Sequence, residues 1–247
     1  MIEYKYVLEQ FQKYVNNLNT KDKEIAIKVS HSYHVADLAG KLAKRMELDE
    51  EKTEIVKTMA LLHDIGRFIQ YSSSGSYNDE KTKINHAEAG DLYLFVEDHR
   101  KDFGIQEEYI PIIRIALINH NKLKIEENLN EEEIFYCKFL RDIDKIDIFR
   151  QEATSYEWTY GEVTKEVEKD FEAHHLVDKR KIKTKADELI AELAYLFDIN
   201  FKESYELLKD TDNLELFLSV VEVKRGYVDK FDNIKKEVRE FLEDKVK

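Results

Sequence analysis

The 247-residue chain contains one cysteine, one proline and seven glycines. A disulfide needs two cysteines, so the single Cys137 cannot form a disulfide within the chain. From this lack of disulfides we expect a cytoplasmic protein. So few glycines and prolines exclude a β-fold with many tight turns. No apolar run approaches the roughly 18 residues of a membrane-spanning helix. The first residues also lack the basic and apolar segments of a secretory signal, so we expect no membrane partner.

The chain is strongly acidic, with 52 aspartates and glutamates against 39 lysines and arginines and a net charge of −13. An acidic surface repels the phosphates of nucleic acids, so we expect no nucleic-acid partner. A local cluster of lysines and arginines can still bind a small phosphate. Because 43% of the residues are apolar, the chain can bury a core and is not a disordered protein.

Apolar residues recur at helical spacing along the whole chain, which predicts an all-α fold. No linker rich in proline and glycine divides the sequence, so we expect one helical domain over residues 1–247, with a soft boundary near 151–160. A loop is expected over 71–83, as either a surface connection or a lid. The expected helices cover residues 3–17, 22–46, 50–63, 86–99, 107–120, 131–150, 161–174, 184–197, 201–209 and 213–243, the last broken near Gly226.

Several residues mark the expected helix ends. Asn85, followed by Glu88, predicts a capping box at the start of a helix. Gly66 and Gly104 are expected just past helix ends, where a left-handed backbone favours glycine.

Three of the eight histidines, His31, His63 and His120, lie at or near the end of an apolar stripe on three separate helices. An isolated buried histidine is usually a hydrogen-bonded core residue, and that alternative is open for each one. Burying several imidazoles is costly unless each finds a partner. A metal ion is a partner that all three can share.

Two aspartates occupy positions that disfavour an unpaired carboxylate. Asp64 follows His63 at the expected C-terminal end of a helix, where the helix dipole disfavours negative charge. Asp144 lies on the apolar face of its helix, so it needs either a metal or a cation such as Arg141 or Lys145. A bound cation would satisfy both aspartates, although a solvated Asp64 beside a turn is the alternative.

Taken in order, these residues resemble the motifs of the HD-domain superfamily of metal-dependent phosphohydrolases. The resemblance covers about residues 25–150, and the segment Leu61-Leu62-His63-Asp64-Ile65-Gly66 is a strong local match. It implies an HD-like helical bundle over about residues 22–150, with additional C-terminal helices over about 151–247. The further matching segments are His31-Ser32-Tyr33-His34-Val35-Ala36, Asn85-His86-Ala87-Glu88-Ala89-Gly90, Ile118-Asn119-His120-Asn121 and Asp142-Ile143-Asp144-Lys145-Ile146-Asp147.

The resemblance also implies a role for each matching residue. It places the ligands of a first metal ion at His31, His63, Asp64 and Asp144. The presence of His86 and His120 resembles the branch of the family that binds a second ion, in which the counterpart of Asp64 bridges the two ions. Many members carry another histidine where Asn121 stands, so one or two ions are expected. Imidazole and carboxylate ligands favour iron, manganese, cobalt, nickel or zinc.

The expected activity is hydrolysis of a small phosphorylated substrate, a phosphomonoester or a nucleotide, by metal-activated water. Asp64, Arg67 and Lys145 are the predicted catalytic residues, with Arg67 and Lys145 supplying positive charge for the phosphate; surface ion pairs are the alternative for both. Two other functions stay open: a di-iron oxygenase of the same fold, and a non-catalytic regulatory module stabilised by metal. An aromatic cluster of Tyr156, Trp158 and Tyr160 is expected to pack in the core or to stack on a base.

Overall fold

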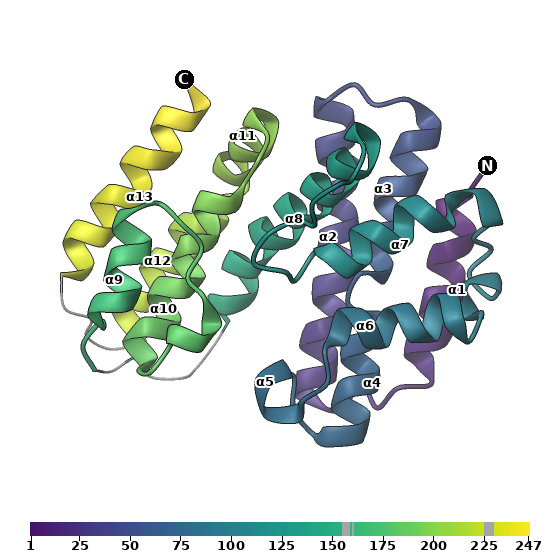
Figure 1. Cartoon of the computed structure of the whole chain (residues 1–247), viewed down its shortest axis with the longest axis horizontal. Helices are drawn as coiled ribbons and strands as arrows, with labels where there is room; N and C mark the ends of the chain where they lie inside the picture. The colour runs from purple at the N-terminus through teal and green to yellow at the C-terminus, as the bar shows by residue number, and fades with distance from the viewer. Residues whose placement is uncertain (155–158, 160, 225–229) are drawn as a thin grey trace. The chain divides into compact units, whose positions relative to one another are not determined.

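The computed structural model describes every residue except 155–158, 160 and 225–229, and it describes no side chain of residues 222–224 (Figure 1). The described residues form helices and turns without a strand, so the predicted all-α class is confirmed. Contacts divide the chain into two compact units, Met1–Asp144 and Lys145–Lys247. This division lies inside helix α8, and the expected single domain stays a prediction. Tyr156, Trp158, Tyr160 and Gly226 lie outside the described residues.

The N-terminal unit contains the helices that carry the predicted ligands. Its α-helices are α1 (Tyr4–Asn16), α2 (Lys23–Arg45), α3 (Glu50–Leu62), α4 (Ile65–Ser74), α5 (Asp79–Thr82), α6 (His86–Asp91), α7 (Ile110–Asn119) and the first part of α8 (Glu131–Glu152). Between α6 and α7 lie three short turns of other helical types, η1 (Leu92–Val96), η2 (His99–Lys101) and η3 (Glu107–Tyr109).

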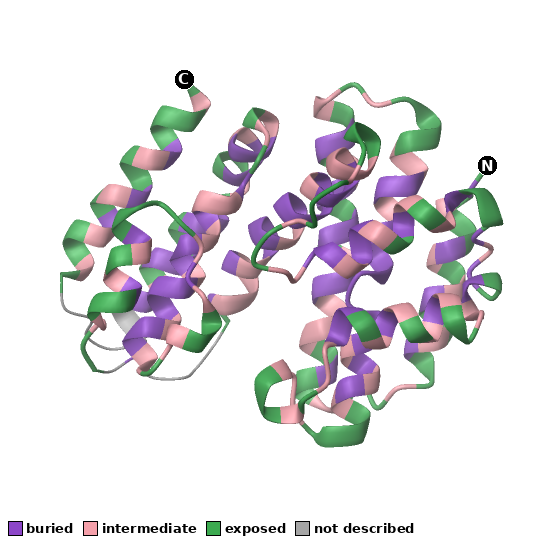
Figure 2. Cartoon of the chain, viewed as in Figure 1, coloured by how far each residue is buried: buried purple, intermediate pink, exposed green. Residues whose placement is uncertain are grey.

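A side-chain cap begins each of α2 and α3, the two helices of this unit that pack most extensively against each other. Asp22 accepts hydrogen bonds from the backbone at the start of α2, and Asp49 does so at the start of α3. These bonds satisfy backbone N–H groups that have no partner within the helix. Helices α2 and α3 pack against each other, and α3 also contacts α1 and α7. Leu42 and Met59 are fully buried in this core, which Figure 2 shows in purple.

The segment around residues 65–84 differs most from the sequence-based expectation. Most of the expected loop is helical, because α4 extends to Ser74 and α5 follows at Asp79–Thr82. The expectation that Gly66 ends a helix is wrong: it lies inside α4, and the left-handed residue after α4 is Gly75, with φ 68°. Gly104 is left-handed as predicted, with φ 71°.

The C-terminal unit is a second helical bundle. Beyond the end of α8 it contains α9 (Lys165–Glu172), α10 (Lys185–Leu193), α11 (Lys202–Asp210), α12 (Asn213–Lys224) and α13 (Phe231–Val246), with the short turns η4 (Lys179–Lys181) and η5 (Ala194–Asp198). Helix α10 packs against α9, and α11 packs against α12 and α13. Within the described part of the chain, every helix is too short or too polar to span a membrane.

Candidate metal centre

The six predicted metal ligands come from different helices and meet in the N-terminal unit. His31 lies in α2, Asp144 in α8, and the histidine–aspartate pair His63-Asp64 lies between α3 and α4; His86 begins α6 and His120 follows α7. The four histidines and Asp64 are each at most 4% exposed. The structure therefore brings together all the ligand candidates, and their binding of a metal stays a prediction.

Asp64 occupies the junction of two helices. Helix α3 ends at Leu62, and Asp64 is the residue before the first turn of α4. The sequence-based expectation placed it only at a helix C-terminus, whereas it also lies at an N-terminus. Its side chain makes no capping bond to α4, so both carboxylate oxygens are directed to other groups.

Gly66 brings α6 to this junction. A Cβ atom at this position would lie 2.0 Å from the carbonyl oxygen of His86 and 2.5 Å from the backbone nitrogen of Gly90. Helices α4 and α6 can therefore touch backbone to backbone, and this contact carries His86 to Asp64. Asn85 is the N-cap of α6, since its side chain accepts hydrogen bonds from the backbone N–H groups of Ala87 and Glu88. The predicted capping box is only half formed, because Glu88 accepts a hydrogen bond from the side-chain nitrogen of Asn85 and not from its backbone.

A first cluster forms around one oxygen of Asp64. Its Oδ2 atom lies 3.8 Å from Nε2 of His31 and 3.8 Å from Nε2 of His63. Oδ1 of Asp144 lies 3.1 Å from Nε2 of His31 and 3.4 Å from Nε2 of His63. Two imidazole nitrogens and two carboxylate oxygens thus converge, which is a ligand set suited to a divalent transition metal.

A second cluster forms around the other oxygen of Asp64. Its Oδ1 atom lies 3.5 Å from Nε2 of His86 and 3.7 Å from Nε2 of His120. The two histidine nitrogens lie 3.0 Å apart. Each oxygen of one carboxylate therefore faces its own pair of histidines.

Hydrogen bonds fix which imidazole nitrogens face the clusters. Nδ1 of His63 donates to the carbonyl oxygen of Ala60, and Nδ1 of His120 donates to that of Leu117. A carbonyl oxygen only accepts, so in the neutral rings the Nε2 atoms carry lone pairs. Nε2 of His63 is buried without a hydrogen bond.

These lone pairs face each other and the carboxylate oxygens. Such an arrangement is repulsive unless a cation lies between the atoms. Two atoms each about 2.1 Å from one ion lie about 3.0–3.6 Å apart at ordinary bond angles. The ligand atoms of the two clusters are separated by comparable distances, so these residues fit one ion in each cluster.

The charge states of the buried groups also suit metal binding. Burial lowers the pKa of His86 to about 3 and also lowers the pKa of His120. Both rings are therefore neutral at pH 7 and can offer lone pairs. Burial alone would raise the pKa of Asp64, but nearby cations, led by Lys28, hold it well below its ordinary value. Asp64 is therefore ionised.

Two cations contact Asp64. Nζ of Lys28 lies 3.2 Å from Oδ2 of Asp64, and Nε of Arg67 lies 3.4 Å from Oδ1. Arg67 also donates from Nη1 to Asp79 and to the carbonyl oxygen of Tyr77. Its Nε–H is buried and makes no hydrogen bond. Arg67 thus lies beside the ligands, as the sequence predicts, and its contact with a phosphate stays a prediction.

The remaining cations named from the sequence have other partners. Arg141 is buried and donates from Nη1 to the carbonyl oxygens of Asn119 and Lys122, so it holds the chain on both sides of His120. Lys145 belongs to the C-terminal unit, where its Nζ lies 2.8 Å from Asp198. Its predicted catalytic role stays a prediction.

Asn121 stands where the resemblance suggests that a further ligand is often found. Its side-chain nitrogen donates to Oδ1 of Asn85, and its own Oδ1 atom is buried without a partner. Asn121 therefore links the end of α7 to the cap of α6.

Sequence reasoning missed two residues of the site. Lys28 precedes His31 by three positions on α2 and so shares its face, a spacing that could have indicated it. Asp79 lies in the expected loop, yet its Oδ2 atom is 2.7 Å from Nδ1 of His86. No local sequence pattern could have found Asp79, because the contact depends on how the segment after α4 folds back.

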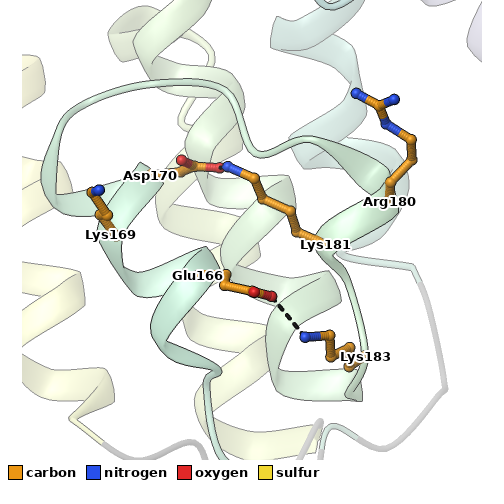
Figure 3. A pocket seen from close by; sticks show the side chains of 6 residues that line it. All are labelled: Glu166, Lys169, Asp170, Arg180, Lys181 and Lys183. Carbon is orange, nitrogen blue, oxygen red and sulfur yellow. Dashed lines mark hydrogen bonds and ion pairs between the residues drawn. The ribbon is translucent and has the colours of Figure 1, made fainter.

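A cavity of about 480 Å³ in the C-terminal unit is formed by other residues (Figure 3). Its cations are largely paired: Lys183 contacts Glu166, and Lys181 contacts Asp170. It contains none of the predicted ligands.

Comparison with known proteins gives one match. The family model described as HD domain matches residues 29–148. This range contains all six clustered ligand candidates. No curated protein and no solved structure matches the chain significantly.

Proposed function

Residues 29–148 of the chain belong to the HD-domain superfamily, and on this basis we propose that the protein is a metal-dependent phosphohydrolase acting on a phosphomonoester or a nucleotide. The observation that best supports this proposal is the position of Asp64, whose two oxygens face two different histidine pairs. One carboxylate can therefore bridge two ions, as in hydrolases with two metals.

Each ion has its own proposed ligands. His31, His63, Asp144 and Oδ2 of Asp64 would hold the first, and Oδ1 of Asp64 with His86 and His120 would hold the second. Iron, manganese, cobalt, nickel and zinc all accept such ligands. A bound divalent ion would polarise a phosphoryl oxygen and lower the pKa of water towards about 7.

The chain itself supplies positive charge for the phosphate. The buried Nε–H of Arg67 makes no hydrogen bond and lies 3.4 Å from Oδ1 of Asp64, so a phosphoryl oxygen bound beside Asp64 could accept its hydrogen bond. Lys28 provides a second positive charge, an ammonium group, beside Asp64. Lys145 belongs to the same proposal and would have to share its charge between Asp198 and a substrate.

A small substrate is the partner that the charge supports. The net charge of −13 opposes binding to nucleic acid and membranes with anionic lipids. A cytoplasmic location, inferred from the single cysteine, is part of the same proposal.

The decisive experiment combines elemental analysis with a broad panel of phosphorylated substrates on one purified sample. We expect one or two transition-metal ions per chain and release of inorganic phosphate. Asp64→Asn should slow this release by about 10²–10³-fold. Asp102→Asn is the matched control, because Asp102 also pairs with a histidine, His99, but on the surface of the same unit.

The alternatives give different results. Iron in the sample together with oxygen consumption and no phosphate release would favour the oxygenase. Bound metal with neither activity on the whole panel would favour the regulatory module.

A further inference from the structure

In His63, His86 and His120, the ring nitrogen that points away from the clusters is held in two different ways. His63 and His120 each donate to a carbonyl oxygen of their own helix, three residues earlier. His86 donates instead to the carboxylate of Asp79, with Nδ1 and Oδ2 2.7 Å apart. His86 therefore depends on a side chain from a different segment.

Helix α4 fixes the position of Asp79. The other oxygen of this carboxylate, Oδ1, accepts hydrogen bonds from Nη1 of Arg67 and Nε2 of Gln70, each at 2.8 Å. Gln70 is fully buried, and its Nε2 atom also lies 3.0 Å from the carbonyl oxygen of Ile84. These bonds attach the segment from Tyr77 to Ile84 to α4.

Arg67 connects this segment to the bridging carboxylate. Its Nη1 atom contacts Asp79, and its Nε atom lies 3.4 Å from Oδ1 of Asp64. That same Oδ1 atom faces His86. Asp64 and Asp79 therefore approach His86 from opposite ring nitrogens, and one guanidinium group joins them.

We propose that Asp79 is a positioning residue that makes the second metal site, formed by Asp64, His86 and His120, bind its ion tightly. The inference rests on the proposed function. A carboxylate that accepts the Nδ1 proton fixes the tautomer with the lone pair on Nε2, orients the ring and makes Nε2 more basic. Among the described residues, the side chain of Asp79 bonds to Arg67, Gln70 and His86 and to no ligand of the first site, so the affinity of that site should not depend on Asp79.

The test is a titration of the metal-free full chain with Mn²⁺ or Zn²⁺ by calorimetry. For the wild type we expect two ions per chain. Asp79→Asn keeps the size of the side chain but removes its charge, and it should weaken the second ion by about 10–100-fold. The first ion should bind with unchanged affinity. Asp79→Glu, which keeps the charge on a longer side chain, should give an intermediate result.

Asp102→Asn is again the matched control and should bind both ions like the wild type, since Asp102 and His99 form a surface pair at 2.9 Å. Thermal unfolding of the metal-free proteins separates a local effect from a loss of the fold. If Asp79→Asn does not fold, the titration of Asp79→Glu decides.

Three results would overturn the inference: a wild type that binds only one ion, a second ion unaffected by either Asp79 variant, or equal weakening of both ions. Hydrolysis does not enter this readout. A wild type that binds two ions in an Asp79-dependent way but releases no phosphate would refute the proposed function and leave the role of Asp79 intact.

Discussion

Replacing Gly66 by alanine should separate the two halves of the metal centre. The added Cβ would lie 2.0 Å from the carbonyl oxygen of His86, and Cβ atoms essentially never approach a heavy atom within 3.0 Å. Helix α6 must therefore move by about 1 Å or more relative to α4. Metal–ligand distances tolerate only about 0.2 Å of error. A shift of this size would take His86 out of reach of an ion bound to Asp64.

The same clash should also cost stability. Forcing an extra methyl group into a packed contact typically costs about 1–3 kcal/mol. Here the atoms that would clash, the carbonyl oxygen of His86 and the nitrogen of Gly90, belong to the backbone and cannot rotate away as a side chain can. Gly40→Ala is the matched control. Gly40 lies inside α2, and its Cβ would meet only flexible atoms of Lys57 at 3.8 Å and beyond. Alanine in a helix interior is favoured over glycine by about 0.5–1 kcal/mol, so this variant should gain stability.

Thermal unfolding of the metal-free proteins and metal content at saturation measure the two effects. We expect Gly66→Ala to unfold at a lower temperature and to keep the first ion but not the second. A Gly66→Ala protein that unfolds like the wild type and binds two ions would show that α4 and α6 do not touch as described.

Three further perturbations test other parts of the centre. Asp64→Asn should remain folded but lose about 10²–10³ in turnover, measured with excess metal, because the amide lacks the charge that holds both ions; full activity would exclude a catalytic role. Arg141→Met should lower the free energy of unfolding by at least about 1–3 kcal/mol, because the carbonyl oxygens of Asn119 and Lys122 lose their donor. Arg114→Met breaks an exposed ion pair and should lower it by less than about 1 kcal/mol. Equal losses in the two variants would contradict the role of Arg141. Removing metal with a chelator should lower the unfolding temperature, because the ligands bind an ion only when folded, and an unchanged temperature would argue against a metal centre in the native protein.

Most of the fold could be predicted from periodicity. The stripe that contains His31 lies on one long helix, α2, and the stripe that leads to His63 lies on α3. Helix periodicity depends only on neighbouring residues, so a sequence shows it directly. The segment after Asp64 was harder, because α4 is short and serine-rich at its end. Its glycine at position 66 looks like a helix end in sequence but fills a contact between two backbones.

The ligand candidates were predictable for a different reason. His31, His63 and His120 lie at or near the ends of apolar stripes, so their inward placement follows from the sequence. The positions of the groups around these histidines could not be predicted in the same way. Asp79 reaches His86 through a segment that folds back onto α4, and such long-range contacts leave no periodic signal. The pairing of Lys145 with Asp198 is likewise a contact between residues far apart in the chain.

The two clusters depend on different parts of the N-terminal unit, and this difference should make them separable. The first cluster is built by α2, by the junction of α3 and α4, and by α8. The second adds only His86 and His120 to Asp64, and His86 is held by the backbone contact at Gly66 and by the carboxylate of Asp79. Gly66→Ala should therefore lose the second ion and Asp79→Asn should bind it about 10–100-fold more weakly, while both variants keep the first ion. If hydrolysis needs both ions, Gly66→Ala should be an inactive protein that still contains one ion, a combination that loss of the fold would not produce.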